Sequence, residues 1–301
     1  MSRGAWIGVF VGVIVLGLAL AVITGLATSG DETTTTSAAI RSTETFDLPL
    51  ALRDDTLALA KHRGKLLVGL VAQSGGSLEV VAVRGSNPVS SGELEISIDG
   101  GPAKAESCGR ACSRVAGPVL DGRARNVEVA VGSSTLPFAL PARLPPSGAN
   151  AFARARRTMG ALRSYHFTER LTSGQGSILT GLDVQAPNRL RLRTNTGFRS
   201  VIIGGTRWDF IDGRWERQRF PGLDVRDVLM WYDARTPRVV RRKANGDTEL
   251  AAFSLKPVSS WFRLTVEPSG RVSQAEMTAP SHFMLHRYSE FDRAPQVKPP
   301  R

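Results

Sequence analysis

Few residues in this sequence could perform chemistry, since its 301 residues include only two cysteines and four histidines. Cys108 and Cys112 lie in the stretch CGRAC, whose small residues are typical of a turn. The N-terminal hydrophobic segment predicts a location outside the cytoplasm, where such a pair favours a disulfide. A metal site is the alternative, but no second Cys or His pair with zinc-like spacing accompanies it. We expect a Cys108–Cys112 disulfide and no bound metal.

The histidines do not form a catalytic or metal-binding motif. His282 and His286 lie in a strand-like pattern, where a separation of four residues is about 13 Å, too far to chelate one ion. His166 alternates with Tyr165 and Phe167, which favours a surface position over a role as a base. The sequence lacks a Gly-x-Ser-x-Gly elbow and a phosphate-binding loop. We therefore expect no enzyme activity and no cofactor.

Binding of an apolar ligand is the chemistry that remains. Four of the five tryptophans lie after residue 200, and many phenylalanines accompany them. They could form an ordinary packed core. They could also line a cavity, because two helices do not cover the whole apolar face of a single large sheet. The candidate cavity residues, chosen by alternation, are Phe167, Leu182, Leu190, Leu192, Ile203, Trp208, Phe210, Val228, Leu229, Phe262 and Leu264.

The N-terminal segment predicts a membrane anchor, residues 1–28. Residues 5–27 carry no charge, and a helix of that length reaches roughly 30 Å, the thickness of a bilayer core. Arg3 precedes the segment, whereas Asp31 and Glu32 follow it. This asymmetry predicts a single-pass protein of the cell membrane with a cytoplasmic N-terminus and an extracytoplasmic remainder. The alternative is a signal peptide that is cleaved after Ser29.

The composition changes along the chain and predicts its domain organisation. Residues 29–45 are rich in Thr and Ser and predict a flexible stalk. Residues 46–141 contain short Val-, Leu- and Ile-rich runs between turn residues, which predicts an immunoglobulin-like β-sandwich. Residues 142–149 are Pro-rich and predict a stiff linker.

Residues 150–294 predict a second, α+β domain, followed by a disordered tail at 295–301. Asn150 is the expected cap of a helix that buries Phe152 and Met159. About eleven strands in an antiparallel meander are expected, interrupted by a second helix that begins at Asp224. In the run RLRLRT, leucine and arginine alternate, which predicts one apolar face and one arginine face. The fold class expected from these patterns is therefore mainly β, with an antiparallel sheet and two helices after the sandwich.

The net charge of +12 lies entirely in the second half of the chain. Residues 1–149 hold 13 basic and 13 acidic side chains, whereas residues 150–301 hold 26 and 14. Near a membrane, this excess predicts attraction to anionic headgroups. Nucleic acid is not an expected partner, because the location is external and no nucleic-acid-binding motif is present. A bias in nucleotide composition is the alternative cause of the arginine content.

The layout of residues 149–294 resembles the LolA-like carrier fold, including the LppX and LprG lipoproteins. The resemblance rests on ARARRTMGALRSYHFTERL, on IIGGTRWDF followed by GRWERQ, and on SGRVSQAEM. It implies a curved half-barrel closed by helices around an apolar cavity for acyl chains. A lipid or a hydrophobic small molecule is the ligand that this resemblance implies.

Residues 46–141 are similar to the extracytoplasmic sandwich of CopC/CopD-type copper-resistance fusions. The similarity rests on CGRAC and on the closing strand FALP. This chain lacks the multi-helix membrane part of that family, which weakens any copper-transport role. The sequence thus predicts a membrane-anchored lipid-binding protein. The alternative is a non-catalytic envelope interaction or sensory module with a protein partner, linked to copper resistance.

Overall fold

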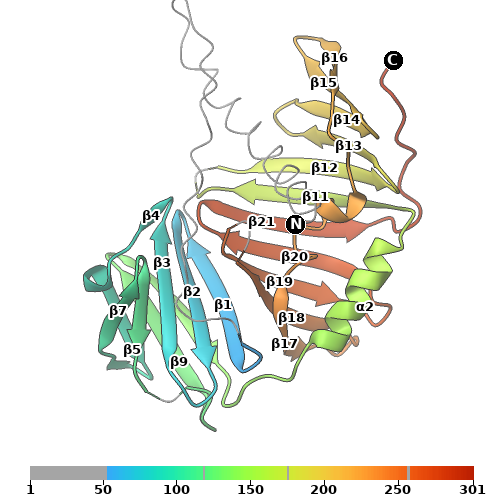
Figure 1. Ribbon diagram of the computed structural model, residues 1–301. Coiled ribbons are helices and arrows are strands. Elements are labelled where there is room, and N and C mark those ends of the chain that lie inside the picture. Colours follow the sequence, from blue (N-terminus) through green and yellow to red (C-terminus); the bar gives the residue numbers. More distant parts are fainter. Residues whose placement is uncertain (1–52, 118, 175, 256–257) are drawn as a thin grey trace, which may run out of the picture.

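The computed structural model describes residues 53–117, 119–174, 176–255 and 258–301. The predicted anchor (1–28), the stalk (29–45) and the first residues of the sandwich lie outside this part. Within the described residues, no helix has the length and apolar character needed to cross a membrane. The described part is mainly β with one α-helix, and its sheets are open (Figure 1).

Two sheets form the first domain, as the alternating apolar runs predict. The order in one sheet is β1-β2-β3-β8-β7, with β4 beside β3, and in the other it is β10-β9-β5-β6. A single apolar cluster lies between them, from Leu57 in β1 to Leu140 in β10. The strands are β1 Thr56–Arg63, β2 Leu66–Gln73, β3 Leu78–Arg84, β4 Asn87–Pro88, β5 Leu94–Ile98, β6 Gly101–Pro102, β7 Ala105–Gly109, β8 Cys112–Val115, β9 Arg125–Val131 and β10 Ser134–Leu140, with a 3-10 helix, η2, at Ser91–Glu93.

The second domain opens with helix α2, Ala149–Gly160. Phe152, Ala155 and Met159 are buried, which confirms the predicted apolar stripe. Asn150 is not the cap, because the helix already begins at Ala149. The residue before the helix is Gly148, and the Ser147 hydroxyl accepts a hydrogen bond from the Ala149 N–H. A hydroxyl two residues ahead thus replaces the expected asparagine.

One antiparallel sheet of eleven strands makes up the rest, in the order β16-β15-β14-β13-β12-β11-β21-β20-β19-β18-β17. The first and last strands of the domain, β11 and β21, pair in the middle of the sheet. Its edges, β16 and β17, stay apart, so the sheet is open (Figure 1). The strands are β11 Ser164–Thr172, β12 Ile178–Gln185, β13 Arg189–Thr194, β14 Arg199–Ile203, β15 Thr206–Ile211, β16 Arg214–Arg219, β17 Arg235–Arg242, β18 Thr248–Ser254, β19 Ser260–Val266, β20 Val272–Ala279 and β21 His282–Ser289.

We call the face of this sheet that α2 covers the inner face, and the opposite one the outer face. Residues 220–234 also pack on the inner face. The second helix predicted from Asp224 is wrong in extent, because only Val225–Val228 forms a 3-10 helix, η3. The Asp224 side chain accepts a hydrogen bond from the Arg226 N–H, as a cap does, but the chain leaves the helical conformation at Leu229. Burial of Leu229 and Trp231 in the core holds this irregular path.

The tail at 295–301, predicted to be disordered, is attached to the second domain. Val297 is fully buried, and its N–H donates to the Gln185 side chain at 3.2 Å. Its carbonyl accepts from the Arg189 guanidinium at 3.1 Å. One apolar residue with both backbone groups bonded is enough to fix a short terminus.

The two domains pack directly on each other, and Figure 1 shows the β1–β2–β3 sheet beside the β17–β21 end of the larger one. A third apolar cluster joins Leu67 and Val71 of β2 to Phe253, Trp261 and Phe283 of the outer face. The sheet with β2 is therefore buried on both sides. This explains the unbroken apolar run LLVGLVA, since a strand with one wet face would alternate.

Candidate ligand-binding face

The inner face carries a row of apolar side chains on three neighbouring strands. Phe167 of β11 pairs with Leu182 of β12, which pairs with Leu192 of β13. All three are at most 4% exposed. They belong to a single cluster that contains eight of the predicted cavity residues, namely Phe167, Leu182, Leu190, Leu192, Val228, Leu229, Phe262 and Leu264. The structure thus brings these eight together, and their contact with a ligand stays a prediction.

The other three predicted residues, Ile203, Trp208 and Phe210, lie on the outer face. Cross-strand pairing fixes this, because paired residues share a face of a sheet. Leu190 pairs with Ile202, which pairs with Arg207, so Arg207 is on the inner face. Successive side chains of a strand point to opposite faces, so Ile203, next to Ile202, and Trp208, next to Arg207, point to the outer face. Phe210, two residues after Trp208, does the same.

Strand β15 has the opposite orientation to the predicted one, because its charged side chains pair with each other on the inner face. The Arg207 Nε donates to an Asp209 carboxylate oxygen at 2.8 Å, and both side chains are at most 8% exposed. The Gln218 amide donates to the other Asp209 oxygen at 2.5 Å. Buried charges are tolerated where they are paired and hydrogen-bonded in this way. The alternation of TRWDFI was therefore predicted correctly, but the side chains expected on the inner face lie on the outer face.

On the outer face, aromatic rings lie among arginines. The Arg199 guanidinium carbon lies 4.0 Å from the centre of the Phe210 ring, and Phe210 meets Trp215 edge to face. Arg193 and Arg217 are exposed on the same face. The alternation in RLRLRT therefore gave the correct faces: leucines inside and arginines outside.

His166, predicted to be a surface residue, takes part in an ion-pair network on this outer face. Its Nδ1 lies 2.8 Å from an Asp183 carboxylate oxygen. Arg191 donates twice to the other Asp183 oxygen, at 2.9 and 2.6 Å. Both oxygens of the Asp183 carboxylate are therefore paired within the sheet. The network thus offers a structural role for His166.

A buried polar chain crosses the inner face, and sequence reasoning missed it. The Trp231 Nε1–H donates to the Tyr288 hydroxyl at 3.2 Å, and this hydroxyl lies 3.1 Å from His286 Nδ1. The other nitrogen of His286 lies 2.7 Å from a Glu169 carboxylate oxygen. Glu169 is 3% exposed and His286 is 2% exposed. The Tyr288 hydroxyl already accepts from Trp231, so we assign it as the donor to His286 Nδ1. The His286 Nε2–H then donates to Glu169.

The two buried tyrosines on this face keep their protons. Burial raises the pKa of Tyr288 and of Tyr165, because a phenolate would lose its hydration there. Tyr165 donates its hydroxyl proton to the Val225 carbonyl at 3.3 Å, which fixes residues 220–234 to β11. Alternation in SYHFTERL could have placed Glu169 inside with Tyr165 and Phe167. A buried carboxylate was not expected without a visible partner.

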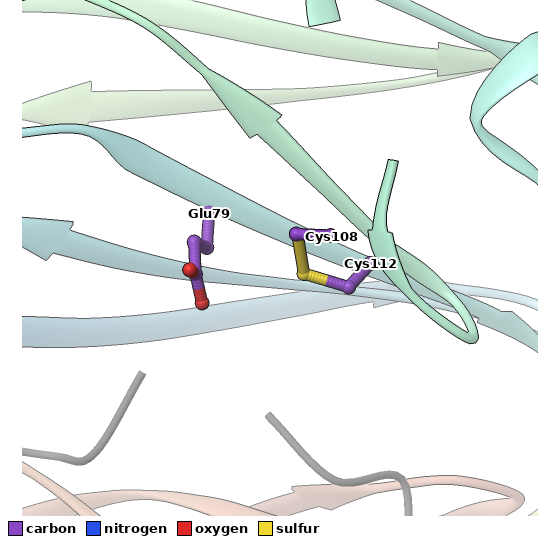
Figure 2. A group of neighbouring side chains, drawn as sticks. All are labelled: Glu79, Cys108 and Cys112. Carbon is purple, nitrogen blue, oxygen red and sulfur yellow. A yellow bond between two sulfur atoms is a disulfide. The ribbon is translucent and has the colours of Figure 1, made fainter. Parts of the chain in front are cut away.

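The predicted disulfide is present, with a Cα–Cα distance of 5.2 Å between Cys108 and Cys112. It joins β7 to β8 beside the turn between them, and Glu79 of β3 lies next to it (Figure 2). One Glu79 oxygen accepts two hydrogen bonds from Arg114, at 3.2 and 2.8 Å, and the other oxygen has no partner. The ligand atoms of these three residues lie within 4.8 Å of one another. Both sulfurs are consumed by the disulfide, so in this form they offer no thiolate to a metal.

A surface hollow of about 570 Å³ lies where loops of the two domains meet. Its lining is mostly polar and includes Lys65 and Arg84 from the sandwich and Ser173 and Ser281 from the second domain. It does not include any of the predicted apolar residues. The hollow and the inner face are therefore separate features.

Comparison with known proteins gives structural neighbours only. No model of a known protein family matches the sequence, and no curated protein does. The chain is similar to the Mycobacterium tuberculosis lipoprotein LppX at 14% identity and a TM-score of 0.37, over 50% of this chain and all of that one. It is similar to LprF from Mycobacterium bovis at 11% identity and a TM-score of 0.37, over 52% of this chain and 99% of that one. LppX is among the lipoproteins that residues 149–294 resemble in layout.

Proposed function

We propose that this chain is a membrane-anchored, extracytoplasmic binding protein that holds a lipid or another apolar ligand on the inner face of its second domain. It acts by binding and without catalysis. The observation that carries the proposal is the continuous apolar cluster on that face, which extends from Leu190 and Leu192 of β13 to Phe262 and Leu264 of β19. These side chains are buried, so a long apolar chain would bind among them once the cover of the face moves aside.

A ligand on this face must displace part of its cover. A helix is about 10 Å wide and covers about two strands at a spacing of about 4.8 Å. Helix α2 packs on β17 and β19. Over the rest of the cluster, the described cover is residues 220–234, whose only helix is the four-residue η3. Leu229 and Trp231 of this segment are buried, and its Val225 carbonyl accepts from Tyr165, so an apolar ligand must displace the segment to reach the cluster.

Burial of a lipid chain supplies enough free energy for binding. Each buried CH₂ contributes about 0.8 kcal/mol, so a chain of about sixteen carbons gains on the order of 10 kcal/mol before the costs of ordering. The charged side chains Arg207 and Asp209 on the inner face pair with each other. They therefore leave the apolar row free of unpaired positive charge.

The charge distribution supports a position close to the membrane. The basic excess lies in the second half of the chain, and exposed arginines such as Arg193 and Arg217 share the outer face with Trp208. Anionic headgroups attract such residues. With the predicted anchor at residues 1–28, the second domain would remain near the bilayer from which a lipid is taken.

Native mass spectrometry of the full chain, extracted in a mild detergent, tests the proposal. We expect a mass increment that organic solvent removes and that lipid analysis identifies as one or a few apolar molecules. A chain that carries no such increment and binds no added lipid would contradict the proposal. A stoichiometric protein in place of lipid would favour the envelope interaction module instead.

A further inference from the structure

The inner face contains buried polar atoms that lack partners. One Glu169 carboxylate oxygen, Oε1, has no hydrogen bond, although its other oxygen accepts from His286. The hydroxyl of Thr180, which is 2% exposed, also has none. Buried polar groups are usually bonded, and an unsatisfied one is costly. These two atoms therefore require an explanation.

Glu169 and Thr180 are direct neighbours across β11 and β12. Directly opposed residues on one face have Cβ atoms about 4.5–5.5 Å apart, so one small group can contact both side chains. Phe167 and Leu182 form the next inward-facing pair along these strands. The polar pair therefore lies directly beside the apolar row described above, in the next row of inward-facing residues.

The two atoms have complementary hydrogen-bonding capacities. In the chain from Trp231 to Glu169, each donor points toward the carboxylate, so Oε1 can only accept. The Thr180 hydroxyl can donate its own proton. A ligand hydroxyl is the small neutral group that donates to one and accepts from the other. A carboxylate or phosphate would be repelled by the Glu169 charge.

We propose that Glu169 and Thr180 form a polar subsite that binds a hydroxyl group of an otherwise apolar ligand. The hydroxyl donates its proton to Glu169 Oε1 and accepts from the Thr180 hydroxyl, while its hydrocarbon chain lies along Phe167, Leu182 and Leu192. The subsite rests on the proposed function and narrows its ligand class to neutral, hydroxyl-bearing lipids. His286 and Tyr288 hold the carboxylate in place as positioning residues.

Two probes test the subsite: hexadecan-1-ol and its methyl ether, in which a methyl group replaces the hydroxyl proton. Each is titrated against the full chain in detergent, and displacement of a polarity-sensitive apolar dye reports its binding. A hydrogen bond to a charged group changes affinity about tenfold to a hundredfold, so we expect the alcohol to bind at least about tenfold more tightly.

Two threonine variants provide a matched comparison. Thr180→Val removes the hydroxyl at nearly constant volume and should reduce the preference for the alcohol severalfold. Thr168→Val makes the same change at an exposed outer-face position of β11 and should leave the preference intact. Glu169→Gln is a second inner-face variant and should also reduce the preference, with thermal unfolding confirming that each variant folds.

The outcomes separate the subsite from the proposed function. Equal binding of the two probes to the unmodified chain, or a preference that Thr180→Val and Glu169→Gln both retain, would overturn the subsite while lipid binding stands. Failure of both probes to displace the dye at any concentration would overturn lipid binding and the subsite together. A water molecule that merely fills the gap would give the first of these results.

Discussion

Replacement of Gly69 by alanine should weaken the interface between the two domains. Gly69 lies in β2 on the side that faces the second domain, and a Cβ there would come within 2.7 Å of ring atoms Cε2 and Cη2 of Trp261. The ring cannot swing aside freely, because Phe253 packs against it edge to face at 4.9 Å. The Cζ2 atom of the ring lies closer still, and contacts between carbon atoms need about 3.5 Å or more, so the sheets must separate by more than about an ångström.

Overpacking of this kind costs about 1–3 kcal/mol. The lower entropy of the unfolded alanine chain offsets about 0.4–1 kcal/mol of this cost. We therefore expect a net destabilisation of about 1–2 kcal/mol, which lowers Tm by about 2–4 °C per kcal/mol for a unit of about 250 residues. Thermal unfolding followed by circular dichroism measures this shift in the detergent-solubilised full chain.

Gly92→Ala is the matched control, because a Cβ at Gly92 meets no atom within 4 Å. It should leave Tm unchanged within about 1 °C, as surface substitutions usually do. Faster proteolysis within residues 142–149 of the Gly69→Ala variant would show that the interface opens. Equal Tm values for the two variants, with equal proteolysis, would refute the packing of β2 on Trp261.

Three further predictions concern the inner face, the disulfide and pH. Tyr288→Phe should lower the free energy of unfolding by about 1–3 kcal/mol, since it removes the hydroxyl between Trp231 and His286. Tyr165→Phe should lower it less, because only one hydrogen bond is lost. Equal urea midpoints for the two variants would contradict the hydrogen-bonded chain from Trp231 to Glu169. Reduction of the Cys108–Cys112 disulfide should cost about 2 kcal/mol, because the closed loop is short, and an unchanged urea midpoint in reductant would count against it. Burial lowers the pKa of His282, so the unfolded chain binds protons more readily and stability should fall as pH decreases below about 6.5. His282→Gln should lessen that fall between pH 7.5 and 5.5, and an identical fall would exclude His282 as a cause.

Strand patterns were the part of the fold that the sequence predicted best. The run RLRLRT placed Leu190 and Leu192 inside, as the structure has them. Eleven strands in an antiparallel meander were expected, and the sheet has eleven. Local alternation determines this level of structure, because each strand buries one face against the same core.

The association of the domains was not predicted, although LLVGLVA carried a signal. A strand with both faces buried has no alternation, and Gly69 gives room for Trp261. The sequence alone does not tell which second surface covers such a strand. Phe253 and Trp261 were interpreted only as part of the second domain.

The candidate site was predicted in part, and its polar residues were the main omission. Aromatic residues were assumed to face inward, which misplaced Trp208 and Phe210, because Arg207 and Asp209 neutralise each other inside. Glu169 was missed because charged side chains were not expected on the inner face. Its partner, His286, is distant in sequence, and only the pairing of β11 with β21 brings them together.

Photolabelling is the measurement that tests the central claim most directly. The full chain is loaded with a neutral lipid that carries a diazirine in its acyl chain, irradiated and digested, and the modified residues are located by tandem mass spectrometry. The account predicts modification of inner-face residues such as Phe167, Leu182 and Leu192. Modification confined to the outer face near Trp208 and Phe210, or none above an unloaded control, would contradict it.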